Sequence, residues 1–148
     1  MKKRILLIGN DKFMREAYVD GKYFVLPKRK YVDALYDSYD IDNISNYELT
    51  SKRAISLVNC FVNHYDYDIC LISFGTNELK NISVELFEKN LQNIINMLIC
   101  KGVVPVIMEF NSDSSFDVNP YNQVISDIKA KNQFDNKFYN DCMKLVNA

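Results

Sequence analysis

Short apolar runs of strand length alternate with segments of helical periodicity along this 148-residue chain, and this alternation constrains its fold more than any other feature. Such an order is typical of βαβ units built around a parallel sheet. The first run is continuous and apolar, as a strand buried on both faces should be. The expected strands are Arg4–Ile8, the weaker Asp40–Ile44, Ile69–Phe74 and Val103–Phe110.

Helical segments fill the gaps between these strands. A cap at Thr50 or Ser51, a cap at Ser83 and the Asn119-Pro120 pair mark helix starts, and Gly102 marks the end of the helix that Ser83 opens. A shorter helix is expected within residues 28–37. The apolar positions expected to face the sheet are Ala54, Ile55, Leu57, Val58, Phe61, Val62 and Tyr65, then Leu86, Phe87, Leu91, Ile94, Ile95, Leu98 and Ile99.

These elements predict a single α/β domain over residues 1–148. Its expected architecture is a three-layer α/β/α sandwich with a parallel sheet of four to five strands, as in flavodoxin-like proteins. Residues 137–141 form either a fifth, edge strand or part of a helix that begins near Phe134. The chain shows no internal repeat, linker or low-complexity segment.

Charge and composition exclude several classes of function. The 18 basic and 19 acidic residues are interleaved, so the basic stripe of a nucleic-acid-binding protein is absent. The 4 cysteines form no CxxC pair and the chain has 1 histidine, so neither a metal site nor a cofactor is expected. Cys60, Cys70 and Cys100 are expected to be reduced, buried thiols.

The N-terminal apolar run is too short for a secretory signal. It begins after Arg4 and ends at Gly9, whereas the apolar segment of a signal peptide has about 7–15 residues. No longer apolar stretch follows. We therefore expect neither export nor membrane insertion, and a cytoplasmic location.

Small, amide and carboxylate residues follow each expected strand. Ligands of open parallel sheets bind outside the carboxyl ends of the strands, near the switch in strand order. We therefore expect a polar pocket there, although Asn, Asp, Ser and Gly also make ordinary loops. The candidate residues are Gly9, Asn10 and Asp11 after the first strand, Ser45 and Asn46 after the second, Gly75, Thr76, Asn77 and Glu78 after the third, and Asn111 after the fourth.

Two of these strand ends resemble sequence blocks of the SGNH/GDSL hydrolases. The segment from Ile5 to Asp11 resembles the first block, a strand that ends in Gly-Asp-Ser, and the segment from Tyr67 to Glu78 resembles the third block, a strand that ends in Gly-x-Asn-Asp. The resemblance covers residues 4–131, including the next helix, the next strand and the Asn-Pro-Tyr-Asn helix start. It implies an α/β/α sandwich and an esterase or acylhydrolase type of site.

The residues that this resemblance implies for the site are only partly present. In the family a serine attacks an ester carbonyl with a histidine as its base, and the oxyanion is held by the serine N–H, a second-block glycine N–H and an asparagine. Asp11 stands at the serine position and Asn77 at the asparagine position, while the glycine position falls at Ser45 or Asn46. The family's Asp-x-x-His block is missing, and the chain ends about where that block should begin.

The single histidine, His64, is not expected to act as the base. It precedes the third strand, whereas the site follows that strand. Strand residues advance about 3.3 Å each, which places His64 on the order of 20 Å from Asn77.

Several functions are compatible with this sequence. A carboxylate is a poor nucleophile toward ordinary esters, and its charge would oppose the oxyanion, so we favour a protein that has lost ester hydrolysis and binds a small polar ligand or a partner. One alternative is an acyl-ester hydrolase, for example of O-acetyl carbohydrates, with non-standard catalytic residues around Asp11, such as Glu78. Another is a receiver-like or flavodoxin-like binding module, although no phosphate loop is present.

The chain is also rich in aromatic residues near its N-terminus. These residues either form an exposed patch, which could be a dimer surface, or fill the core beneath a long loop. They are Tyr18, Tyr23, Phe24, Tyr31, Tyr36 and Tyr39.

Overall fold

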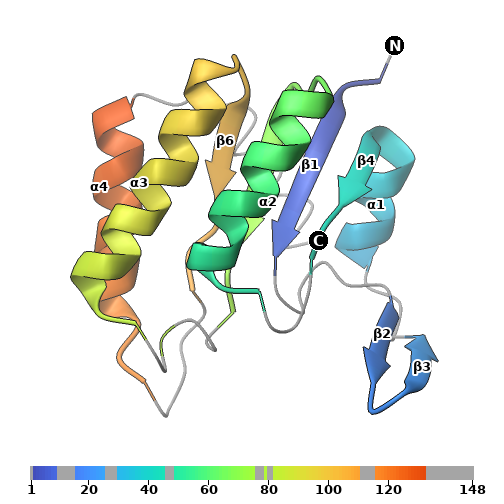
Figure 1. Cartoon of the computed structure of the whole chain (residues 1–148), viewed down its shortest axis with the longest axis horizontal. Coiled ribbons are helices and arrows are strands. Elements are labelled where there is room, and N and C mark those ends of the chain that lie inside the picture. Colours follow the sequence, from blue (N-terminus) through green and yellow to red (C-terminus); the bar gives the residue numbers. More distant parts are fainter. Residues whose placement is uncertain are drawn as a thin grey trace.

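The computed structural model describes residues 2–9, 16–25, 30–45, 49–75, 79, 82–110 and 116–132, of which 16–19, 23–25 and 30–32 are described by their backbone only. Its main sheet is parallel and has the strand order β4-β1-β5-β6 (Figure 1). The strands are β1 (Arg4–Gly9), β4 (Asp40–Asn43), β5 (Ile69–Ser73) and β6 (Val104–Ile107). The predicted α/β class and parallel sheet are confirmed; the alternatives for residues 137–141 lie outside the described residues.

Helices cover both faces of this sheet. The helices are α1 (Lys30–Ser38), α2 (Ser51–His64), α3 (Val84–Cys100) and α4 (Asn119–Asn132). One core cluster joins α2, α3 and α4 to one face of the sheet, and a second joins Leu35 of α1 to the other face. Figure 1 shows α2 and α3 side by side in front of the strands. The predicted layering is therefore confirmed.

Local capping explains where the helices begin. The Thr50 side chain accepts a hydrogen bond from the Arg53 N–H, and the Ser83 side chain accepts one from the Leu86 N–H, as the sequence predicted. The third start differs from the prediction. Here α4 begins at Asn119 itself, and the carboxylate of Asp117 accepts from the Asn119 N–H at 3.1 Å.

Three of the four strands of the main sheet are shorter than predicted, whereas β1 extends one residue further, to Gly9. The expected strand over residues 103–110 is paired only as Val104–Ile107, and those expected to end at Ile44 and Phe74 end one residue earlier. Hydrophobicity continues past the paired region because Met108 and Phe110 still enter the core after the ladder stops. Apolar runs thus mark burial rather than pairing.

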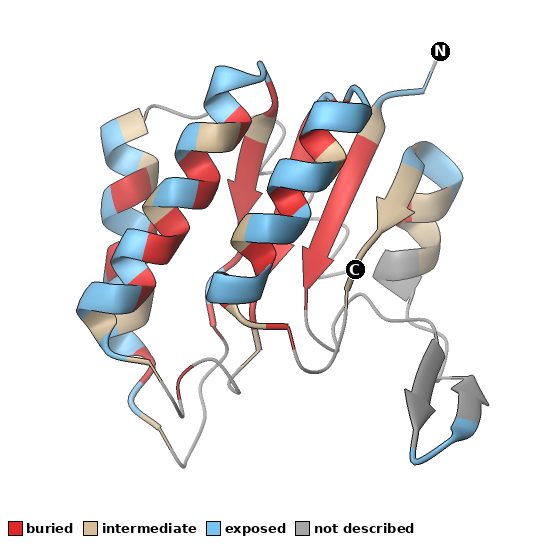
Figure 2. Cartoon of the chain, viewed as in Figure 1, coloured by how far each residue is buried: buried red, intermediate tan, exposed pale blue. Residues whose placement is uncertain are grey.

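The predicted core is correct at its centre and wrong at its margins. Ile5 to Ile8 are fully buried, as are Ala54, Val58 and Phe87. Leu57, Tyr65, Leu86 and Ile99 were also expected to face the sheet, yet they are 36%, 52%, 46% and 47% exposed. Figure 2 shows exposed residues along the outward sides of α2 and α3.

The cysteines follow the same division. Cys70 in β5 is buried, whereas Cys60 and Cys100 are exposed, which corrects the prediction of buried thiols for these two. Both lie on helix positions that face away from the sheet, next to buried neighbours such as Leu98. The apolar stripes with which α2 and α3 face the sheet do not include Cys60 or Cys100, so both thiols face solvent.

A hairpin between β1 and α1 was not predicted. It comprises β2 (Glu16–Val19) and β3 (Lys22–Val25), which pair antiparallel through a two-residue turn at Asp20 and Gly21. Both turn residues have positive φ, 50° and 74°, the backbone that a primed hairpin turn requires. Tyr18 pairs with Tyr23 across it, so part of the aromatic region is a hairpin.

Two of the N-terminal aromatic residues have described side chains. Tyr36 and Tyr39 are partly buried against the second core cluster, which agrees with the core alternative for these two residues. The other side chains of that set are outside the described residues. Across the described part of the chain, we find no helix with the length and apolar character needed to cross a lipid bilayer.

Candidate functional site

The carboxyl ends of β1 and β5 lie next to each other at the switch in strand order. From β1 the chain passes to β4 on one side and then crosses to β5 on the other, so these neighbours flank the switch point. The last residue of β1, Gly9, pairs with Ser73 at the end of β5. Ligand sites of open α/β sheets form at this place.

Part of the predicted site can be located. Gly9 is buried at the end of β1, and Gly75 is partly exposed two residues after β5. Ser45 follows β4 by two residues, and the N–H of the intervening Ile44 donates to the Leu7 carbonyl, on the side of β1 opposite to β5. Gly9, Ser45 and Gly75 therefore all lie at the carboxyl ends of the parallel strands. Asn10, Asp11, Asn46, Thr76, Asn77, Glu78 and Asn111 lie outside the described residues.

Among the described residues, Ser45 has a buried side-chain polar atom that forms no hydrogen bond. Its hydroxyl is buried and has no hydrogen-bond partner in the described part of the chain. Its backbone N–H donates to the Asn43 side chain at 3.0 Å, so this N–H is not available to hold an oxyanion. Asn46, the other position predicted for the second-block N–H, lies outside the described residues.

Aromatic side chains of the core pack together beyond the carboxyl ends of β5 and β6. Phe87 of α3 contacts Phe74 edge-on, with ring centroids 6.3 Å apart, and it also packs against Phe110 and Tyr121. The Asn122 side chain accepts from the Phe110 N–H and donates to its carbonyl, at 2.7 and 3.0 Å. The segments that leave β5 and β6 are therefore anchored before they reach the predicted site.

His64 lies at the other end of the sheet. It is the last residue of α2, which starts near the carboxyl edge at Thr50 and runs back to the amino end of β5. Its ring is exposed, and its Nδ1 lies 2.7 Å from the Cys60 carbonyl. This agrees with the prediction that His64 is not a catalytic base for residues at the carboxyl edge.

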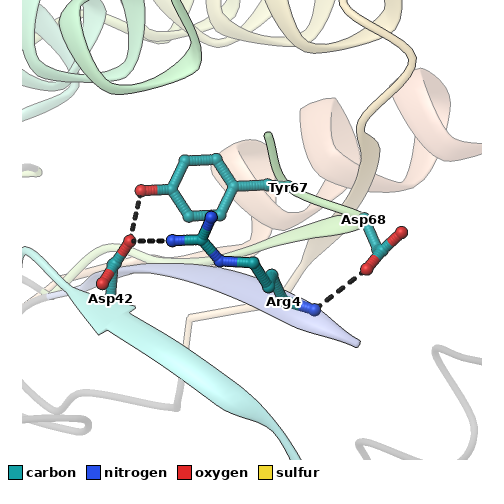
Figure 3. Close-up of polar contacts among 4 residues, drawn as sticks. All are labelled: Arg4, Asp42, Tyr67 and Asp68. Atoms are coloured by element: carbon teal, nitrogen blue, oxygen red, sulfur yellow. Dashed lines mark hydrogen bonds and ion pairs between the residues drawn. The ribbon is translucent and has the colours of Figure 1, made fainter. Parts of the chain in front are cut away.

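A polar cluster that the sequence analysis missed lies nearer the amino end of the sheet (Figure 3). The Arg4 guanidinium lies 3.3 Å from the Asp42 carboxylate, which also accepts a hydrogen bond from the Tyr67 hydroxyl at 2.5 Å. The Arg4 N–H donates to Asp68 at 2.9 Å. Burial, followed by the hydrogen bond to Asp42, raises the pKa of Tyr67.

This cluster ties neighbouring strands together. The Arg4 side chain links β1 to Asp42 of β4, and the Arg4 backbone N–H links β1 to Asp68, which directly precedes β5. A tyrosine whose pKa is raised gives up its proton less readily near neutral pH, so it is a weaker general acid. The sequence carries no signal for this cluster, because Arg4, Asp42 and Tyr67 are far apart in the chain and meet only after folding.

Comparison with known proteins was made on sequence and on structure. Neither a protein-family model nor a curated protein matches the sequence. Solved structures do match. The chain has the fold of the SGNH/GDSL hydrolases. It superposes on a putative lipolytic protein of the G-D-S-L family from Desulfitobacterium hafniense with a TM-score of 0.69 and 12% identity, covering 89% of this chain and 74% of that one.

Two esterase structures give similar agreement. The lipase/acylhydrolase from Enterococcus faecalis matches with a TM-score of 0.62 and 20% identity over 89% of this chain and 73% of that one. The psychrotrophic esterase EstA from Pseudoalteromonas sp., in a structure inhibited by monoethylphosphonate, matches with a TM-score of 0.61 and 18% identity over 84% and 73%. At these identities the comparison establishes the SGNH-like fold, which was predicted from the two sequence blocks.

Proposed function

We propose that this chain is an SGNH/GDSL hydrolase-like protein that does not hydrolyse ordinary esters and binds a small polar ligand or a partner at the carboxyl ends of β1 and β5. The observation that carries this proposal is the pairing of Gly9 with Ser73. Asp11 follows Gly9 by two residues and Asn77 follows Ser73 by four, so both turns start from neighbouring points. The cytoplasmic location stays a prediction from the sequence.

The chemistry of these residues argues against ester cleavage. An attack by Asp11 on an ester would form an anhydride, and the negative charge of Asp11 would oppose the oxyanion that Asn77 is suited to hold. The one histidine of the chain, which could have activated a nucleophile, lies at the opposite end of the sheet. A carboxylate beside an amide is better suited to hydrogen-bond hydroxyl or ammonium groups of a ligand.

The first experiment measures hydrolysis of p-nitrophenyl acetate and p-nitrophenyl butyrate. We expect no turnover above the protein-free rate. The informative variant is Asp11→Asn, and the matched control is Asp37→Asn, which changes an exposed aspartate of α1 in the same way. Clear turnover that is lost in Asp11→Asn and retained in Asp37→Asn would contradict the proposal and favour the hydrolase with non-standard residues around Asp11.

The second experiment tests binding at the same place. Thermal unfolding is followed with neutral sugars, amines and, as anionic comparators, acetate and phosphate. We expect a stabilising compound to be neutral or cationic, and to lose its effect in Asp11→Asn and Asn77→Ala but not in Asp37→Asn. A compound that stabilises all these proteins equally would place its site elsewhere.

A further inference from the structure

The outward sides of α2 and α3 carry no charge over most of their length. No Asp, Glu, Lys or Arg occurs from Ala54 to Tyr65 or from Asn90 to Cys100, although 25% of the chain is charged. The water-facing side of an amphipathic helix is normally where charged residues gather. The exposed residues of these stretches, which we call the uncharged helix face with His64 counted as neutral, are Ser56, Leu57, Asn59, Cys60, Asn63, His64, Tyr65, Asn93, Asn96, Ile99 and Cys100.

Apolar side chains contribute to this region. Leu57 and Ile99 are 36% and 47% exposed, and Tyr65, at the end of α2, is 52% exposed. The Tyr65 ring packs against Phe61 one turn earlier, with centroids 6.1 Å apart. Depletion of charge, together with exposed aromatic and aliphatic groups, is the composition found at the centre of protein interfaces.

Exposed charges occupy the four ends of this face in an alternating pattern. At the carboxyl edge of the sheet, α2 begins with Lys52 and Arg53, whereas α3 begins with Glu85, Glu88 and Lys89, which sum to one negative charge. At the amino edge, Asp66 follows α2 and Lys101 follows α3. Each helix thus has opposite charge at its two ends, and the two helices have opposite orders.

The basic end of α2 is unfavourable for the helix itself. The first turn of a helix is stabilised by negative side chains because the free N–H groups make it electropositive. This turn of α2 contains Lys52 and Arg53 and no acidic residue. The placement of Lys52 is therefore not explained by the stability of α2, whereas Arg53 also has a contact within the chain.

We propose that the uncharged helix face binds a second copy of this chain across a two-fold axis. With four charges that alternate in sign around the face, each positive end meets a negative end of the second copy when the two-fold axis lies in the plane of the contact and runs either across or along the helices. With the axis across the helices, α2 meets α2 of the other copy and Lys52 faces Asp66. With the axis along them, α2 meets α3 and Lys52 faces Glu85 or Glu88. Self-complementarity of this kind is the requirement for an isologous dimer.

The size of the face indicates a weak dimer. At about 1.5 Å per residue, α2 and α3 are roughly 21 and 25 Å long, and each is about 10 Å wide. The projected area is then on the order of 450 Å², below the about 800 Å² per partner of a standard interface even after allowance for surface relief. We expect dissociation constants in the micromolar range.

The test is the molar mass of the whole chain by light scattering between about 1 and 200 µM, chosen to span a micromolar equilibrium. The informative variant is Lys52→Glu with Arg53→Glu, which places acidic residues in the electropositive first turn; its unfolding temperature is measured alongside because Arg53 also has a contact within the chain. Its matched control is Lys22→Glu with Lys131→Glu, two exposed lysines away from this face. We expect at least about tenfold weaker dimerisation in the first variant only, because reversed charges turn attraction into repulsion.

Compensating changes then identify the axis. Adding Asp66→Lys to the charge-reversed variant should restore the dimer if α2 contacts α2, and adding Glu85→Lys with Glu88→Lys should restore it if α2 contacts α3. A monomer at every concentration, a dimer unaffected by the reversal, or rescue by neither addition would overturn the proposal. A dimer unaffected by the reversal would favour the aromatic N-terminal region instead.

Thiol labelling gives a second measurement. With Cys142→Ser in every protein, maleimide should reach Cys60 and Cys100 but not the buried Cys70. Labelling of Cys60 should be slower at high than at low protein concentration in the otherwise unaltered chain, and this difference should vanish in the charge-reversed variant. Equal labelling rates at all concentrations would count against a contact at this face.

Discussion

Two serines near the start of α2 differ in how their hydroxyl groups are satisfied. The Ser51 hydroxyl is buried and accepts a hydrogen bond from the Asn90 side chain at 3.0 Å, which joins α2 to α3. The Ser45 hydroxyl is buried without a partner in the described residues. A buried polar group costs free energy unless it is hydrogen-bonded, so the same substitution should have different effects at the two positions.

We predict that Ser51→Ala lowers the free energy of unfolding by about 1–3 kcal/mol, because it leaves the Asn90 amide without its acceptor. Ser45→Ala should change it by less than about 0.5 kcal/mol or raise it. Urea unfolding of both variants measures this difference. A loss at Ser45 as large as that at Ser51 would show that the Ser45 hydroxyl has a partner.

The pKa of Tyr67 makes a prediction at high pH. Burial, followed by the hydrogen bond to Asp42, raises this pKa above the ordinary tyrosine value of about 10. Above pH 10 the unfolded chain releases the proton while the folded chain keeps it, so the folded state holds more protons. The stability that Tyr67 contributes is therefore fully present below pH 10 and is lost as the pH rises beyond it.

Comparison with Tyr67→Phe isolates this effect. At pH 7 the variant should be less stable by about 1 kcal/mol, a modest value because Asp42 is 39% exposed. Between about pH 10 and 11 the difference should shrink and then reverse. Burial also raises the pKa of the Cys70 thiol, but Cys70 is common to both proteins and cancels. A difference that stays constant with pH would contradict the assignment.

At the scale of elements, boundaries followed local chemistry that can be read from sequence. Thr50, Ser83 and Gly102 acted as predicted because a cap or a left-handed residue depends on its immediate neighbours. The hairpin was not predicted although Asp20-Gly21 is a strong hairpin signal, because the flanking Tyr and Phe residues were assigned to either an exposed patch or the core beneath a long loop. The exposure of Leu57 and Cys60 was not predicted, because apolar residues next to the buried side of α2 cannot be distinguished by residue type from those on it.

Gly102 offers a test at this scale. It ends α3 with φ at 72°, and a Cβ built there meets nothing within 4 Å. Gly102→Ala should therefore cost about 1 kcal/mol through backbone conformation alone, and Gly102→Asn should cost less because Asn tolerates this region. Thermal unfolding of the two variants gives the comparison; equal losses would indicate that the side-chain volume matters instead.

At the scale of the whole molecule, the sequence predicted the layers and the parallel sheet because buried strands and amphipathic helices each leave a periodic signal. The strand order was not predictable from periodicity, and it is the order that puts Gly9 beside Ser73. The polar cluster around Arg4 was equally invisible, since its members are far apart in the chain and meet only after folding. The Asp11 and Asn77 assignments remain proposals, as does the single domain over residues 1–148.

The position of His64 has a consequence for the proposed loss of ester hydrolysis. A helix that returns along the full height of the sheet carries this imidazole to the far end, and no rotamer change can bring it back. Under our proposal, replacing Asp11 with serine would therefore supply a hydroxyl without this histidine beside it. An esterase built on this scaffold by our proposal would then need at least two new side chains introduced together, so neither change alone would improve activity in a stepwise selection.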